Sequence, residues 1–175
     1  GLIGHRVIDT RFPTQRIRPQ IPVLSVTEEQ KMLSYLAGHR STYNLGLQIC
    51  LLTGIRIGEL CALKWGDVDL QSGIISIRRT AHRVYLIDNG PKHSELTIDY
   101  PKTANSYRDI PVIKKLSDIL REYSEEQSDE TFIISGLPRP TEPQTMRNHF
   151  KQVAGSLGIS MHRFHGLRHT FATRC

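Results

Sequence analysis

Residues 165–173 read HGLRHTFAT and place a histidine three positions before an arginine. Side chains three residues apart lie on one face of a helix, so His165 and Arg168 are predicted to point the same way. A second arginine, Arg56, lies far upstream in the stretch TGIRIGEL of residues 53–60. Two guanidiniums and an imidazole suit a phosphodiester whose negative charge grows during phosphoryl transfer. These residues therefore predict a phosphate-binding site built from distant segments.

Arg56 stands at a predicted structural boundary. It follows Gly54, where a tight turn permits close backbone approach, and it precedes a predicted helix over residues 57–63. Glu59 comes three residues later, where its carboxylate can hold the Arg56 guanidinium in one rotamer. Taken alone, this spacing is more typical of an Arg–Glu pair on a solvated helix face.

Lys102 belongs to the polar stretch PKTANSYRDIP of residues 101–111, which leads into a predicted strand. A lysine at the tip of a hairpin can reach a substrate and donate a proton to a leaving oxygen. Taken alone, a hairpin lysine more often only solubilises the surface. Lys102 is therefore a candidate only in combination with the other cations.

The chain of 175 residues carries a formal net charge of +6 and a pI near 9.4, which favours an anionic partner. This charge is unevenly distributed. Acidic residues gather between positions 122 and 130, whereas residues 137–175 contain only one carboxylate and the bases Arg139, Arg147, Lys151, Arg163, Arg168 and Arg174. The distribution predicts one electropositive face and an acidic rim.

The C-terminal histidines suggest the hypothesis of a metal site, because His165 and His169 have the spacing of helical zinc ligands. Position 166 is glycine where that motif needs glutamate, so no metal is expected, and His169 is predicted to be hydrogen-bonded inside the core. A metal-dependent nuclease that uses these histidines is the weakest alternative. The sequence contains no P-loop, nucleophile elbow or dinucleotide fingerprint, and we expect no cofactor.

The hydrophobic pattern predicts an α+β fold, mainly helical, with a small antiparallel sheet inserted in the middle. Residues 1–22, which contain three prolines, are predicted to be an arm or interdomain linker, and residues 23–175 one domain. Helices are expected over residues 27–38, 43–52, 57–63 and 113–127, from 143 to about 155–158, and from 164 to the end. The first is predicted to open with a capping box, Thr27 to Gln30.

Short strands are expected at residues 74–79, 84–87, 95–98 and 107–112, with a further extended piece at 131–135. The connections between these strands are too short for crossover helices, so the sheet is predicted to be antiparallel. No stretch has the length of a membrane span, and the three cysteines form no close pair. A reducing cytosol is the expected compartment.

Three segments taken in order resemble the tyrosine recombinases, or phage integrases. Residues 53–67, TGIRIGELCALKWGD, resemble the first box of that family, residues 102–111 its β-hairpin lysine segment, and residues 165–173 its second box. The resemblance runs from about residue 23 to residue 175. It implies the mixed fold expected above and an enzyme that cleaves and rejoins double-stranded DNA in site-specific recombination.

The resemblance also implies roles for single residues. Arg56 and Arg168 would clamp the nonbridging oxygens of the scissile phosphate, Lys102 would be the general acid for the leaving 5′ oxygen, and His165 would assist acid–base chemistry. Supporting roles behind these fall to Glu59 and His169, and DNA contacts are expected from Arg163 and His162. No metal or nucleotide is implied, because a 3′-phosphotyrosine stores the energy of the broken bond.

The family's nucleophilic tyrosine follows the second box, where this sequence has no tyrosine. We therefore expect a catalytic domain cut before its nucleophile and inactive as it stands. The alternative is a DNA-binding module that keeps the phosphate pocket without chemistry. By resemblance, the parent enzyme would be a tetramer on DNA in the bacterial cytoplasm, encoded by a mobile element, while the cut chain is expected to be a monomer with no membrane partner.

Overall fold

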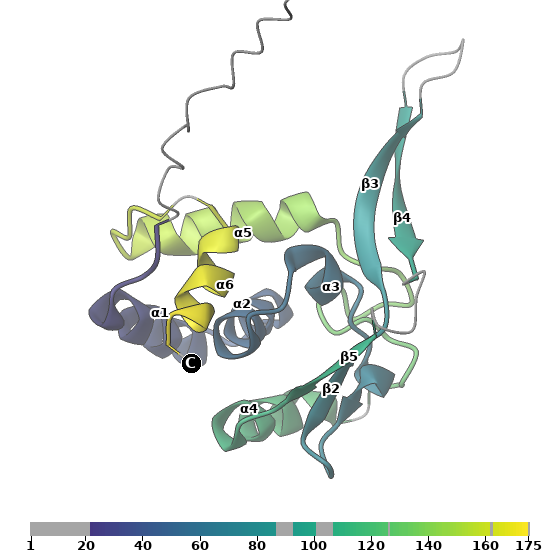
Figure 1. Cartoon of the computed structure of the whole chain (residues 1–175), viewed down its shortest axis with the longest axis horizontal. Coiled ribbons are helices and arrows are strands. Elements are labelled where there is room, and N and C mark those ends of the chain that lie inside the picture. The colour runs from purple at the N-terminus through teal and green to yellow at the C-terminus, as the bar shows by residue number, and fades with distance from the viewer. Residues whose placement is uncertain (1–21, 87–92, 101–106, 126, 162, 175) are drawn as a thin grey trace, which may run out of the picture.

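The computed structural model describes residues 22–86, 93–100, 107–125, 127–161 and 163–174. The candidates Lys102 and His162 lie outside these ranges, as do residues 1–21 of the predicted arm. The fold is the expected mixture of helices and small antiparallel sheets (Figure 1). Within the described residues, no helix has both the length and the apolar character needed to span a bilayer.

Helix α2 lies at the centre of the helical part of the molecule (Figure 1). It packs against all the other α-helices, and most of its side chains are buried. An apolar surface on every side is what allows a helix to be surrounded in this way. The α-helices are α1 (Val26–Gly38), α2 (Thr42–Thr53), α3 (Ile57–Cys61), α4 (Lys114–Ser124), α5 (Pro143–Ser156) and α6 (His165–Ala172).

The strands form two antiparallel sheets where the sequence predicted one. Strands β1 (Val68–Asp69), β2 (Ile74–Ile77) and β5 (Arg108–Pro111) make the first, and β3 (Thr80–Leu86) pairs with β4 (His93–Asp99) in the second. The chain leaves the first sheet at Arg78 and Arg79. There the Arg79 guanidinium turns to the buried carboxylate of Asp67, at 2.8 and 3.2 Å, and the predicted strand 74–79 is interrupted.

The capping box of α1 begins at Ser25, so its predicted position at Thr27 is wrong. The Ser25 hydroxyl accepts from the Glu28 amide at 3.2 Å, and the Glu28 carboxylate accepts from the Ser25 amide at 2.8 Å. Both four-residue stretches match the capping pattern, but the earlier one completes the helix and leaves Thr27 in its first turn.

Other boundaries moved by a few residues. Helix α3 ends at Cys61, and α4 is shorter than the range 113–127. Helix α6 ends at Ala172 with Thr173 as its C-cap, so the prediction that it continues to the last residue is wrong. In the piece 131–135, Phe132 forms an isolated bridge to Lys64. The stop of α5 is confirmed, because Gly158 follows it with a φ of 67°.

Candidate functional site

The α3, α5 and α6 segments surround a cavity of about 470 Å³, which we call the basic hollow. Five of its lining side chains carry a permanent positive charge, and none is a carboxylate. The lining residues are Ile55, Arg56, Ile57, Gln144, Arg147, Lys151, Arg163, Phe164, His165 and Arg168. Such a set of cations without acids favours an anionic ligand.

The turn after α2 brings Arg56 and Arg168 to the same hollow. Gly54 ends α2 with a φ of 63°, and Arg56 follows as the N-cap residue of α3. Helix α6 packs against α2, and a Cβ on Gly54 would lie 2.5 Å from the Phe171 ring. The Arg168 guanidinium donates to the Gly54 carbonyl. The two arginines therefore line one cavity, as the sequence predicted.

Glu59 holds two arginines from different elements. Its carboxylate accepts from Arg56 Nη1 at 3.1 Å and from the Arg56 amide at 2.8 Å. It also accepts hydrogen bonds from both terminal nitrogens of Arg108, on β5, at 2.8 and 2.7 Å. Glu59 is 7% exposed whereas the Arg56 side chain is 60% exposed, so the expected Arg–Glu pair is present, with a buried carboxylate and a solvated guanidinium. Burial by itself would raise the pKa of Glu59, but the hydrogen bonds from Arg108 and Arg56 outweigh it and lower that pKa.

His165 begins α6 and lies among positive charges. Its pKa is lowered, first because part of the ring is withdrawn from water and then because His169, Arg168 and Arg56 are close. A lowered pKa favours the neutral imidazole near neutral pH. A neutral imidazole can accept a proton or donate one.

His169 does not have the hydrogen-bonded core position that the sequence predicted. Its ring meets that of His165 edge-on, with centroids 4.6 Å apart and an interplanar angle of 84°. The buried Nε2 atom has no hydrogen-bond partner among the described residues. The ring is therefore placed by packing against His165.

Three residues of α5 line the hollow without having been predicted as site residues. Gln144, Arg147 and Lys151 recur at spacings of three and four residues, which places them on one helix face. Arg147 donates to the Gln144 carboxamide at 3.2 Å. The signal that finds them is this helical spacing of polar residues, combined with the basic composition of the last forty residues. Arg163 also lines the hollow.

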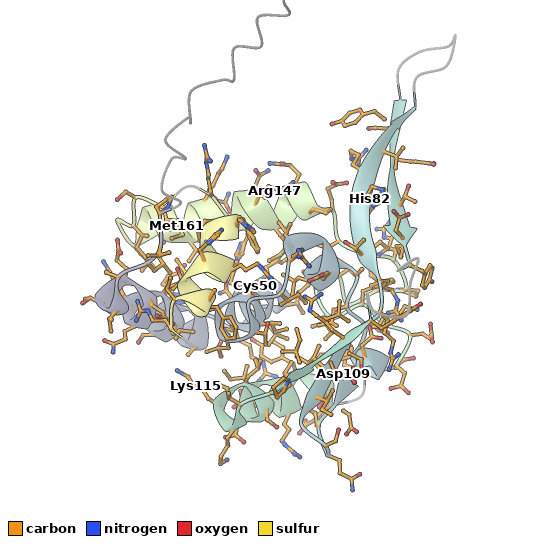
Figure 2. The ribbon with its side chains drawn as sticks, in the orientation of Figure 1. Cys50, His82, Asp109, Lys115, Arg147 and Met161 are labelled. Atoms are coloured by element: carbon orange, nitrogen blue, oxygen red, sulfur yellow. The ribbon has the colours of Figure 1, made fainter. Side chains whose placement is uncertain are left out.

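A second cavity of about 490 Å³ adjoins the first, and we call it the hairpin hollow. Strand β3 contributes Thr80, Ala81, His82, Arg83 and Tyr85 to its lining. Figure 2 labels His82 on this hairpin and Arg147 on α5. Arg56, Ile57 and Arg147 line both hollows, which therefore form one continuous surface. Tyr85 is 74% exposed there.

The described residues contain no group of three or more histidine, cysteine, aspartate or glutamate side chains placed to hold a metal ion. The chemistry that the site supports directly is the binding and polarisation of an anion by fixed cations.

The sequence of the chain is similar to that of proteins from one family. Residues 22–175 match the sequence model of the phage integrase family. A tyrosine recombinase XerC-like protein of Caldanaerobacter subterraneus is 27% identical over 187 residues, covering 98% of this chain. The chain spans about half the length of that relative, 47%.

Two solved structures share the fold. The Tn1549 transposon integrase in complex with transposon right end DNA superposes with a TM-score of 0.70 at 23% identity, covering 92% of this chain and 55% of that one. A lambda integrase tetramer bound to a Holliday junction gives a TM-score of 0.58 at 21% identity, covering 93% of this chain and 42% of that one.

Proposed function

The chain belongs to the phage integrase family, and from this premise we propose that it is a catalytic-domain segment of an enzyme that recombines DNA by cleaving and rejoining strands. The observation that carries the proposal is the basic hollow, in which five permanent cations from separate segments converge without a carboxylate. A duplex backbone offers a matching row of negative charges. The Tn1549 integrase and the lambda integrase, which share this fold, are bound to DNA in their structures.

The scissile phosphate takes its place between Arg56 and Arg168 in this proposal. Arg168 is anchored through the Gly54 carbonyl, while Glu59 holds Arg56 from behind. Guanidiniums that are fixed before the ligand arrives stabilise developing charge without reorganisation at the moment of reaction. Removing one such donor in phosphoryl transfer costs on the order of 3 kcal/mol of transition-state stabilisation.

Protons move through His165 and Lys102. His165 lines the hollow, and its lowered pKa makes the neutral ring available as an acid–base group near neutral pH. The part of Lys102 as general acid for the leaving 5′ oxygen stays a prediction from family resemblance. Arg163, which lines the hollow, is proposed to contact the DNA backbone, and His162 stays a prediction of the same kind.

Duplex binding tests the phosphate clamp. Fluorescence anisotropy with a short labelled duplex is expected to show weak, salt-sensitive binding by the 175-residue chain. Arg56→Gln and Arg168→Gln should each weaken binding by about tenfold on every sequence tried, and should each lower the slope of log affinity against log salt by about one.

Lys114→Gln is the matched control, because it removes one exposed cation on α4, which contributes no residue to the lining of either hollow. It should change affinity by less than about twofold. Equal effects of Lys114→Gln and Arg56→Gln would overturn the clamp and leave only general attraction by net charge. An effect of Arg56→Gln restricted to one DNA sequence would also contradict a phosphate contact.

A suicide DNA substrate separates catalysis from binding. No tyrosine is found among the described residues that line the basic hollow, so this chain should form no covalent adduct. A covalent protein–DNA species would show that one of its own tyrosines reaches the phosphate. The second candidate function is a DNA-binding module without chemistry, which the same hollow supports. It predicts clamp-dependent binding but no cleavage by the natural protein.

Partners follow from the same proposal. The parent enzyme would act as a tetramer on two duplexes, which is supported by the lambda integrase structure, a tetramer bound to a Holliday junction. The segment alone is proposed to be a monomer that binds double-stranded DNA. Its place is proposed to be the bacterial cytoplasm, where the DNA of a mobile element is accessible.

A further inference from the structure

The β3–β4 hairpin forms one wall of the hairpin hollow and projects from the helical body (Figure 1). Its base packs against α3. Its middle reaches the residue that precedes α5, through one side chain of β3. Because both hollows share Arg56 and Arg147, they form one groove, and the hairpin is the wall of that groove beside the basic hollow.

That side chain is Arg83, which joins three segments. Its Nε and Nη2 atoms donate to the Glu142 carboxylate at 3.0 and 2.5 Å. Its Nη1 atom donates across the hairpin to the Ser94 carbonyl at 3.0 Å and to the Ser94 hydroxyl at 2.8 Å. Every guanidinium nitrogen is therefore engaged within the protein.

A carboxylate at Glu142 is unexpected, because the other charged residues that line the two hollows are basic. It is the one carboxylate among the described residues that line either hollow. A negative charge beside a DNA backbone opposes binding. Its side chain is 25% exposed and directed to Arg83, so the acid is held in a specific contact.

We propose that Arg83 and Glu142 act as a strut that fixes the hairpin against α5 and keeps the groove open to a DNA duplex. Both are positioning residues, since they act through the hairpin and not by touching the phosphate. The inference rests on the proposed DNA-binding function. Loss of the strut lets the hairpin sample positions in which the duplex does not fit, and apparent affinity falls in proportion to the competent fraction.

For Glu142→Gln, the strut and simple electrostatics predict opposite changes in duplex affinity. Glu142→Gln removes a negative charge from the groove, which on electrostatics alone strengthens DNA binding. The strut predicts that Glu142→Gln weakens duplex binding by roughly fivefold, which corresponds to a hairpin that is competent about one fifth of the time. Asp118→Asn on α4 is the matched control, since it makes the same charge change in an exposed ion pair away from the groove.

The experiment combines two measurements on the whole chain. Amide hydrogen exchange of the described hairpin strands, residues 80–86 and 93–99, reports on the hairpin itself, and duplex anisotropy over a salt series reports on affinity. Glu142→Gln, Arg83→Gln and the double variant should all exchange faster in the hairpin and bind duplex more weakly, with an unchanged salt slope. The double variant should match Arg83→Gln, because Arg83→Gln already removes the contact with Glu142 as well as the bonds to Ser94. Exchange in α2, the central helix, serves as the check that each variant is folded.

Three results would overturn the strut. Unchanged hairpin exchange in Glu142→Gln, with α2 protected, shows that the contact does not hold the hairpin. Tighter duplex binding by Glu142→Gln shows that the carboxylate acts by charge. A fall of about one in the salt slope for Arg83→Gln alone shows that Arg83 contacts a phosphate. If the unaltered chain binds no duplex, the DNA-binding proposal fails by itself and hydrogen exchange alone decides the strut.

Discussion

The guanidinium of Arg168 donates a hydrogen bond to the backbone carbonyl of Gly54. Gly54 stands two residues before Arg56, so this bond ties the helix that carries one arginine to the turn that presents the other. The two cations reach the basic hollow from positions more than a hundred residues apart, and one contact fixes their relative places. Preorganised charge of this kind is what a phosphate clamp needs.

Arg168→Lys tests that contact through stability. Lysine keeps the charge but replaces the planar fork with a single flexible ammonium, so the bond to the Gly54 carbonyl is weakened. We expect the free energy of unfolding to fall by about 1 kcal/mol, measured by urea denaturation. Arg163→Lys, at another lining position, is the control and should change stability little. Equal stabilities of the two variants would contradict an anchoring role.

Gly54→Ala tests the turn between α2 and α3. The residue has a φ of 63°, and an added Cβ would lie 2.5 Å from the Phe171 ring on α6. Gly136→Ala is matched, because its φ is 64° and no atom lies within 4 Å of the added Cβ. Gly136→Ala should cost about 1 kcal/mol of unfolding free energy, from backbone strain alone. Gly54→Ala should cost at least about 1 kcal/mol more, because α6 must shift as well. Equal losses would show that Phe171 moves aside freely.

Glu59→Gln breaks the carboxylate's contacts with Arg56 and Arg108. The Arg108 guanidinium then loses two charge-assisted hydrogen bonds in a half-buried place, and we expect a loss of about 2 kcal/mol in unfolding free energy. The salt-dependent affinity for duplex should fall too, because Arg56 loses its fixed rotamer. Stability equal to that of the unaltered chain in chemical denaturation would show that this ion network is not structural.

The same carboxylate predicts a pH dependence. The pKa of Glu59 is lowered in the folded chain from its usual value of 4.5, so the unfolded chain binds the proton more readily. The contribution of Glu59 is complete above pH 4.5 and is lost as the pH falls through the lowered folded pKa. Denaturation midpoints measured from pH 7 to pH 3 should therefore fall less steeply for Glu59→Gln than for the unaltered chain. Parallel curves would contradict the assignment.

His165 provides a spectroscopic test of the hollow. Its pKa in the free chain should lie below the usual 6.5, because of desolvation and the positive neighbours His169, Arg168 and Arg56. Nuclear magnetic resonance titration of the ring should show this, and Arg56→Gln should move the value upward. A duplex phosphate in the hollow should raise the pKa of His165 as well, since it offsets the same positive charges. A pKa that is unmoved by saturating duplex would place the phosphate elsewhere.

The local pattern of the sequence was enough to predict the helices, whereas the convergence of Arg56 with Arg168 was expected from the resemblance to the phage integrases. Helical spacing and a glycine stop are properties of a few neighbouring residues, and the turn at Gly54 is one of them. The division of the strands into two sheets was missed, because strand pairing joins residues that are distant in the sequence, as β2 does with β5. The start of α1 was misplaced because two overlapping stretches fit one capping pattern.

Partners brought in by the tertiary fold were harder to predict. Arg108 binds Glu59 from a separate strand, and nothing in the spacing of Glu59 and Arg56 indicates a third member. The sequence shows that Arg147 and Lys151 are basic. That their face of α5 lines the basic hollow is known only once α6 and α3 are placed beside it. The packing of His169 against His165 is a local contact between residues four apart on α6, whereas the lack of a hydrogen-bond partner for the His169 Nε2 atom among the described residues depends on what surrounds that helix.

The position of a bound phosphate tests the central claim most directly. A crystal structure of the chain with a short duplex should show one backbone phosphate with nonbridging oxygens within about 3.2 Å of both the Arg56 and the Arg168 guanidiniums. His165 should face the same phosphate. A duplex whose backbone passes outside the basic hollow, or that meets the two arginines at different phosphates, would contradict the account.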